Sequence, residues 1–219
     1  MLYQFQGGAD GANPVGIYVD TSGNVYGATS DGGVYNQYYG YLGTVFELSP
    51  PVQPGAAWTK ATLFSFPAPS AGYEPYAPVV LGPDGNLYGT TLYDSHGHDG
   101  VVFELTPPTI AGQPWTETIL HSFDGTDGGD IDAPVVFDNS GNLYGSTGFG
   151  GRGGGGTVFK LKPPSTTGGP WTSGWRVPFN SADGSSPTGS LVILPDDTIY
   201  GVTIQGGSNN FGTVYQIQP

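Results

Sequence analysis

The chain has 219 residues, with 39 glycines, 20 prolines and no cysteine, so disulfides, thiolate metal sites and cysteine nucleophiles are excluded. Eighteen acidic residues against five basic ones give a formal net charge of -13, which would repel nucleic-acid phosphates and anionic membrane surfaces. The length and the 37% apolar content fit one domain with an ordinary core, residues 1–219.

Four copies of one unit fill the chain. A Tyr-Gly pair recurs at intervals of 62, 56 and 56 residues, with its tyrosine at Tyr26, Tyr88, Tyr144 and Tyr200. An aromatic residue followed two positions later by leucine or isoleucine recurs in step, at Phe46, Phe103, Phe159 and Tyr215. The periods predict repeats at about residues 1–58, 59–115, 116–171 and 172–219.

Each copy contains short apolar runs separated by turn residues, the pattern of β-strands. In chain order, the first expected strand is residues 2–5, and the second copy then shows four, at residues 78–81, 86–91, 100–105 and 115–123. The first two strands of a copy are joined by turns such as residues 82–85, where glycine supplies the positive φ of a tight hairpin. Asp197 takes this glycine's place in the fourth copy. No 3.6-residue periodicity predicts a helix.

Four-stranded units repeated every 56 residues are typical of propeller blades, so we predict an all-β, four-bladed β-propeller. The last copy stops at its third strand, residues 213–217, while residues 2–5 align with the fourth strands at 63–66 and 120–123. We therefore expect the N-terminal strand to close the last blade of a monomer. The alternatives are a dimer that forms an eight-bladed ring and a chain that is part of a larger propeller.

The repeat is similar to a known family. Its motifs are Asp-Gly-Ala-Asn-Pro at residues 10–14, Gly-Thr-Val-Phe-Glu-Leu at 43–48 and Gly-Asn-Leu-Tyr-Gly-Thr-Thr at 85–91. They resemble the Gloeobacter/Verrucomicrobia-type tandem repeat of bacterial surface proteins, over nearly the whole chain. The resemblance implies a β-propeller and an extracellular or cell-surface location, and it supplies no catalytic motif. The chain departs from the pattern in a Tyr-rich insertion in the first copy and at Asp197 and Thr198 in the fourth.

Residues kept in every copy are interpreted as scaffold, and residues peculiar to one copy are free to serve function. The repeated tyrosines, the threonines that follow them (Thr29, Thr91, Thr147 and Thr203) and the outer tryptophans (Trp58, Trp115 and Trp171) are expected to pack between blades. A sugar-stacking belt is the alternative for the tryptophans. The loops that join the fourth strand to the next first strand, and the second strand to the third, share one face, here called the upper face. These loops hold 10 of the 18 acidic residues and, of the basic residues, only Arg152.

Two single-copy features of the upper face predict a ligand site. Four tyrosines in a Gly-rich loop, Tyr35, Tyr38, Tyr39 and Tyr41, offer amphipathic rings suited to sugars or peptides; the alternative is a loop folded onto its own blade. Residues 94–99 place two imidazoles between carboxylates, which suits a transition metal or a general base; the alternative is a solvated polar loop. The expected polar partners are Asp94, His96, His98, Asp99 and Arg152.

A third single-copy feature is acidic. The loop at residues 124–132 clusters oxygen ligands of the kind that Ca²⁺ prefers, although the spacing does not match an EF-hand. The expected ligands are Asp124, Asp127, Asp130 and Asp132, and an unliganded acidic loop is the alternative. His121 is interpreted as a packed strand residue.

No nucleotide-binding or hydrolase motif occurs in a suitable context, so no nucleotide cofactor is expected. We predict a binding module that recognises a carbohydrate or another extracellular polymer through its upper loops, with a neutral or cationic polyhydroxylated ligand favoured by the charge, and without membrane insertion. The first alternative is a polysaccharide-active enzyme: a lyase with His96 or His98 as base, Tyr38 as acid and Arg152 opposite a substrate carboxylate, or a hydrolase with paired carboxylates. The second is a structural repeat of a surface protein.

Overall fold

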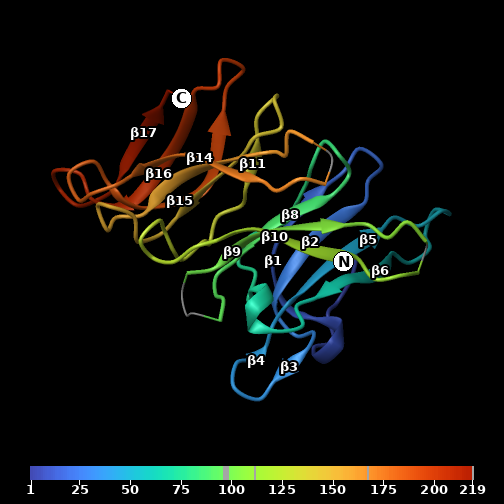
Figure 1. The fold of residues 1–219 in the computed structure, drawn as a ribbon. Helices are drawn as coiled ribbons and strands as arrows, with labels where there is room; N and C mark the ends of the chain where they lie inside the picture. Colours follow the sequence, from blue (N-terminus) through green and yellow to red (C-terminus); the bar gives the residue numbers. More distant parts are fainter. Residues whose placement is uncertain (96–98, 111, 167, 219) are drawn as a thin grey trace.

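The computed structural model describes residues 1–95, 99–110, 112–166 and 168–218, and it confirms an all-β chain arranged as four propeller blades (Figure 1). Within the described residues the helical segments are two three-residue 3-10 turns, η1 (Gly8–Asp10) and η2 (Pro69–Ala71). None of the helical segments described could span a bilayer.

Each blade is an antiparallel sheet whose strands follow one another in chain order. Blade 1 consists of β1 (Ala12–Val19), β2 (Val25–Asp31), β5 (Thr44–Ser49) and β6 (Thr59–Ser65). Blade 2 consists of β7 (Val80–Leu81), β8 (Leu87–Thr91), β9 (Val101–Thr106) and β10 (Thr116–Ser122). Blade 3 consists of β11 (Val136–Phe137), β12 (Leu143–Thr147), β13 (Thr157–Lys162) and β14 (Thr172–Pro178). Blade 4 has three strands, β15 (Ser185–Ile193), β16 (Ile199–Gln205) and β17 (Thr213–Ile217).

The expected closure of the last blade by residues 2–5 is corrected by this topology. Residues 1–6 form no strand, and within the described part of the chain β17 is bonded to β16 alone. Tyr3 and Phe5 instead pack against a core cluster of blade 1, and the Phe5 ring lies 5.0 Å from the ring of Phe46. The N-terminus and β17 lie at opposite ends of the row of blades, so the row is open and one chain does not bring them together (Figure 1).

The Tyr-Gly pair has a steric explanation. Its glycine stands in the second strand of each blade, and the aromatic ring from the third strand lies directly across it. A Cβ atom on Gly89 would lie 2.5 Å from Cζ of Phe103, and the contact repeats at the same distance for Gly27 with Phe46 and for Gly145 with Phe159. A side chain at this glycine would therefore displace the ring that fills the space between blades.

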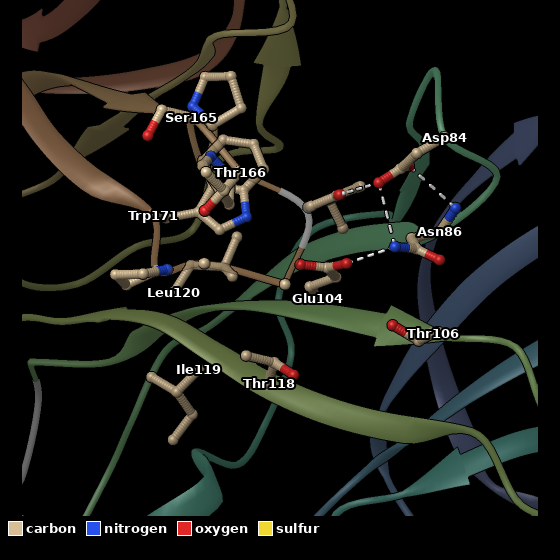
Figure 2. Close-up of a pocket in the computed structure, with 16 residues that line it drawn as sticks. Asp84, Asn86, Glu104, Thr106, Thr118, Ile119, Leu120, Ser165, Thr166 and Trp171 are labelled. Carbon is tan, nitrogen blue, oxygen red and sulfur yellow. Dashed lines mark hydrogen bonds between the residues drawn. The ribbon is translucent and has the colours of Figure 1, made fainter.

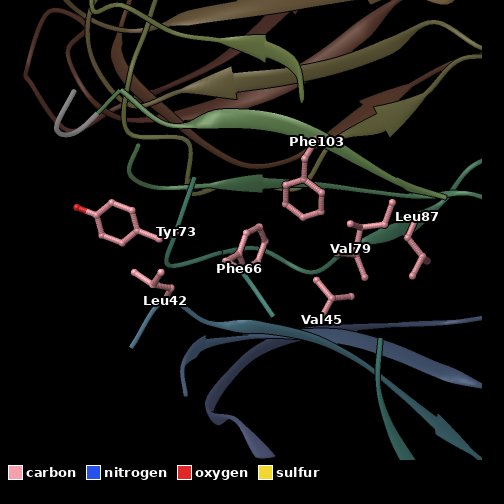
Figure 3. Packing of buried hydrophobic residues seen from close by; sticks show 8 residues of the cluster. Leu42, Val45, Phe66, Tyr73, Val79, Leu87 and Phe103 are labelled. Carbon is pink, nitrogen blue, oxygen red and sulfur yellow. The ribbon is translucent and has the colours of Figure 1, made fainter. Parts of the chain in front are cut away.

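The core lies between the blades (Figure 3). Leu42, Val45 and Phe66 from blade 1 and its following loop meet Val79 and Phe103 of blade 2, all of them buried. Equivalent clusters join blades 2 and 3 and blades 3 and 4. The expected packing of the outer tryptophans between blades is confirmed for Trp115 and Trp171, which contact the clusters between blades 1 and 2 and between blades 2 and 3. Trp58 instead packs on a cluster of blade 1, together with Tyr3 and Phe5.

The repeated threonines act within a blade rather than between blades. Thr147 Oγ1 lies 3.1 Å from Thr157 Oγ1 on the neighbouring strand and donates a hydrogen bond to the carbonyl of Phe149. The pair recurs as Thr29 with Thr44 and as Thr203 with Thr213. Gly128 of the loop before blade 3 has φ 145, and a Cβ there would lie 2.6 Å from the Thr147 side chain. The hydroxyl pairs thus hold the upper loops close to the sheets.

Replacing Gly89 with Ala is expected to lower the free energy of unfolding by roughly 1–3 kcal/mol, since the buried Phe103 ring has no space to move away. Urea denaturation followed by circular dichroism measures this. Adding Phe103→Leu, which shortens the opposing side chain, should recover part of the loss that Gly89→Ala causes. Equal denaturation midpoints for wild type and Gly89→Ala would show that the ring is not confined.

Candidate functional site

The Tyr-rich insertion of blade 1 folds as a small hairpin of its own, with strands β3 (Tyr35–Asn36) and β4 (Gly40–Tyr41), which projects from the row of blades (Figure 1). Asn36 Oδ1 accepts hydrogen bonds from the amides of Tyr38 and Tyr39, at 2.9 and 3.3 Å. The Tyr39 ring, in the turn of the hairpin, lies 5.3 Å from the ring of Tyr73, so the hairpin packs on the loop between blades 1 and 2.

Beside this hairpin is a cleft of about 450 Å³, here called the upper cleft. Its wall combines the end of β2, the hairpin and the loop that leads into blade 2. The lining residues are Asn13, Ser30, Asp31, Tyr39, Gly40, Tyr41, Glu74 and Tyr76. Two of the four predicted tyrosines line the cleft, whereas the other two, Tyr35 and Tyr38, are not among its lining residues.

The upper cleft contains two carboxyl groups, Asp31 and Glu74. Burial, together with the nearby charge of Asp31, raises the pKa of Glu74. Glu74 has φ 52 and stands where the chain enters blade 2, and its amide donates to the carbonyl of Leu42 at 2.9 Å. The raised pKa makes it easier for Glu74 to take up a proton, and a protonated carboxyl group can donate a hydrogen bond that a carboxylate cannot. Sequence reasoning placed Glu74 in an upper loop without giving it a role.

The other predicted ligand residues do not join the upper cleft. Asp94 is buried, and Asp99 lies beside the acidic loop, where its Oδ1 would be 3.2 Å from a Cβ on Gly129. Arg152 is exposed in the loop between β12 and β13 of blade 3, and none of these three side chains lines the cleft. His96 and His98 lie outside the described residues.

The acidic loop contains an ion-pair cluster that crosses from blade 2 to blade 3. Asp127 Oδ2 lies 2.8 Å from His121 Nε2 and 2.9 Å from an Nη of Arg176. Burial alone would raise the pKa of Asp127, but the hydrogen bonds from His121 and the Asp124 amide and the charges of His121 and Arg176 outweigh burial and lower it. His121 also packs on Phe123, at 4.5 Å, as its strand position predicts. Sequence analysis did not identify the ion pair between Asp127 and Arg176, because the two residues belong to different copies of the repeat.

This arrangement offers little to a metal ion. Asp127 is already paired with His121 and Arg176, and Asp124 accepts hydrogen bonds from the amide and hydroxyl of Thr126. Across the part of the chain that the structure describes, no three Asp, Glu or His side chains gather as a metal-binding group. Calcium at Asp124, Asp127, Asp130 and Asp132 stays a prediction, which calorimetric titration of chelator-treated protein would test.

A larger cavity of about 960 Å³ lies on the opposite face, between β10 and residues 163–166 and 168–171 of the connector to β14 (Figure 2). Its wall includes Trp171, Asp84, Asn86 and Glu104, and sequence reasoning did not identify it as a site. Its polar groups already bond to one another: Asn86 Nδ2 donates to Asp84 at 3.1 Å and also to Glu104, and Tyr88 donates to Asp84 at 2.7 Å. We therefore interpret these groups as supports of the turn between β7 and β8.

Glu117 has a buried carboxyl oxygen without a hydrogen-bond partner among the described residues. In blade 1 the aligned Lys60 pairs with Asp10 at 2.9 Å, but in blade 2 the residue aligned with Asp10 is Ala71. Glu117 Oε1 is buried without a hydrogen-bond partner, and burial raises the pKa of Glu117 to about 8. Folding therefore favours the protonated form of this carboxyl group.

Glu117→Gln is expected to stabilise the protein at pH 8 by roughly 2–3 kcal/mol and to have little effect at pH 4. Below about pH 4.5 the carboxyl is neutral in both the folded and unfolded states. As pH rises towards 8 the unfolded chain ionises first, so stability falls in the wild type and not in the variant. Urea titrations at the two pH values measure this, and an equal difference at both would contradict the role of ionisation.

Comparisons with known proteins agree with the fold. The model of the Gloeobacter/Verrucomicrobia repeat family matches residues 109–219. No curated protein matches the sequence. Similar solved structures include a luciferin-regenerating enzyme (16% identity, TM-score 0.51, covering 93% of this chain and 60% of that one). A periplasmic gluconolactonase of Pseudomonas aeruginosa is 15% identical with a TM-score of 0.52, and the match covers 92% of this chain and 55% of that one. A Dyadobacter fermentans protein of unknown function is 11% identical with a TM-score of 0.51, and the match covers 94% of this chain and 65% of that one. The chain thus spans less than two thirds of the length of these structures, and identities this low show the fold alone.

Proposed function

This chain belongs to the Gloeobacter/Verrucomicrobia repeat family, and we propose that it is an extracellular binding module whose upper cleft holds a neutral or cationic polyhydroxylated ligand, such as a stretch of polysaccharide. The observation that carries the proposal is the convergence of Tyr39, Tyr41 and Tyr76 with Asp31 and Glu74 around one cleft. The aromatic rings suit the apolar faces of sugar rings, and the carboxyl groups suit their hydroxyls.

Charge supports this ligand class over acidic polymers. The upper loops hold 10 of the 18 acidic residues and one of the five basic ones, so an anionic polysaccharide would meet repulsion over the whole face. The cleft itself contains two carboxyl groups and, within its described lining, no cationic side chain. A family found in surface proteins fits a ligand outside the cell.

The carboxyl pair also favours a second candidate, glycoside hydrolysis. The general acid of such an enzyme stays protonated near neutral pH while its partner remains ionised, and burial beside Asp31 shifts the pKa of Glu74 in this direction. The lyase candidate has less support, because Arg152 lies on another blade and does not line the upper cleft.

The double variant Tyr39→Ala/Tyr76→Ala is expected to weaken polysaccharide binding at least tenfold, since each ring removed costs about 1 kcal/mol or more at a binding hot spot. Affinity electrophoresis in gels that contain a neutral glucan, a mannan, chitosan or polygalacturonate measures the binding. Retardation by the neutral or cationic polymers, and not by polygalacturonate, is the expected pattern for the wild type.

The matched control is Tyr35→Ala/Tyr38→Ala, which removes two tyrosines from the same hairpin that do not line the cleft and are 65% and 82% exposed. This control should bind as the wild type does. Equal loss of binding in both double variants would mean that the hairpin, rather than the cleft, makes the contact. A third variant, Thr118→Lys, fills the cavity on the opposite face, and loss of binding in this variant alone would place the site there. Release of sugar products from a glucan that the wild type binds, together with loss of this release in Glu74→Gln, would establish the hydrolase.

A further inference from the structure

Blade 4 exposes a face that every other blade buries. Val202 and Val214 are paired across β16 and β17 and are 44% and 79% exposed. The residues aligned with Val214 are completely buried, and those aligned with Val202 are at most 1% exposed. In the first set are Val45, Val102 and Val158, and in the second Ala28, Thr90 and Ser146. Ile204, two residues after Val202 on β16, is a further exposed apolar side chain of this blade, at 59%.

In blades 1 to 3 this face covers the next blade. Val45 packs in one cluster with Val79 of blade 2, and Val158 packs in another with Leu191 of blade 4. The Val202–Val214 face therefore has the composition of a blade-to-blade interface, without the blade that would cover it. An apolar surface of this kind is typical of an interaction site.

Blade 4 also lacks a fourth strand. In the other blades β6, β10 and β14 bond to the outer edge of the third strand, whereas among the described strands β17 has a neighbour on one side alone. Its other edge presents backbone amides and carbonyls that can pair with an additional strand.

The N-terminal segment, residues 2–5, aligns with the fourth strand that blade 4 lacks. Phe5 aligns with Phe66, and the two make the same contact: Phe5 lies 5.0 Å from Phe46 on blade 1, and Phe66 lies 5.3 Å from Phe103 on blade 2. Phe66 follows directly after β6, the fourth strand of the preceding blade. Residues 2–5 thus take on blade 1 the place that the end of the fourth strand of blade 1 takes on blade 2.

We propose that two copies of this chain associate head to tail, with blade 4 of each copy packed on blade 1 of the other and residues 2–5 added to the edge of β17. One sequence supplies both halves of the contact, and the open row of blades keeps them apart within a single copy (Figure 1). Two such contacts, related by a two-fold axis, close a ring of eight blades and leave no exposed blade face.

The direct test is a disulfide trap, which suits a chain without cysteine. In blade 1, Ser65 of the fourth strand lies opposite Thr44 of the third strand. The residues aligned with this pair are Gln4 and Thr213. The variant Gln4→Cys/Thr213→Cys therefore places two thiols opposite each other in the proposed pairing. Under mild oxidation this variant should run as a covalent dimer in a non-reducing gel, while each single variant remains monomeric. A disulfide within one chain would show closure of a single ring, and no disulfide would show that the strand does not pair; either result overturns the proposal.

Light scattering after size exclusion gives the second readout. The 22.7 kDa chain should elute as a dimer of twice that mass, and Val214→Asp should convert it to a monomer with unchanged circular dichroism. The control Val52→Asp, at a fully exposed position of the connector between β5 and β6, should stay dimeric. A wild type that is monomeric at micromolar concentration contradicts the proposal. If Val214→Asp fails to fold, the disulfide trap alone decides.

Discussion

The aromatic ring that crosses a glycine in each blade is the contact on which the rest of this structure depends. Gly89 leaves space for the ring of Phe103, and the ring in turn fills the gap between blades 1 and 2 against Phe66. Because the same contact recurs every 56 residues or so, each blade meets the next with similar spacing. The upper cleft exists because of this spacing, since its wall is shared between the loops of blades 1 and 2.

The periods of aromatic residues and glycines were sufficient to predict the blades and their strands, because each landmark fills a steric role that recurs in every copy. The turn glycine was predicted in the same way, and Asp197 indeed takes its place with φ 64. Closure of the ring could not be predicted, since alignment says which strand residues 2–5 resemble but not whether the curvature of four blades brings them to β17. The packing of Tyr3 and Phe5 on blade 1 depends on that curvature.

The candidate site was predictable only in part. Tyr39 and Tyr41 were predicted because the Tyr-rich insertion occurs in one copy only. Glu74 and Tyr76 were not predicted, since the position of their loop relative to the hairpin depends on how blades 1 and 2 pack. Arg176 illustrates the same limit, because its partner Asp127 lies in the loop that joins blades 2 and 3, in the preceding copy of the repeat, and no spacing rule connects them. Residues that act within one copy can be recognised from the repeat, and residues that meet across blades cannot.

Two cavities on opposite faces offer aromatic and carboxyl groups, and they differ in how those groups are used. In the cavity beside Trp171 the carboxylates of Asp84 and Glu104 accept hydrogen bonds from Asn86 and Tyr88, whereas the upper cleft combines tyrosine rings with Glu74, whose pKa burial raises. Hydrogen exchange with mass spectrometry, with and without a neutral glucan that the protein binds, distinguishes the two cavities as ligand sites most directly. Slower exchange confined to residues 35–41 and 73–76 is the expected result, and slower exchange at residues 163–171 with none at the upper cleft would contradict it.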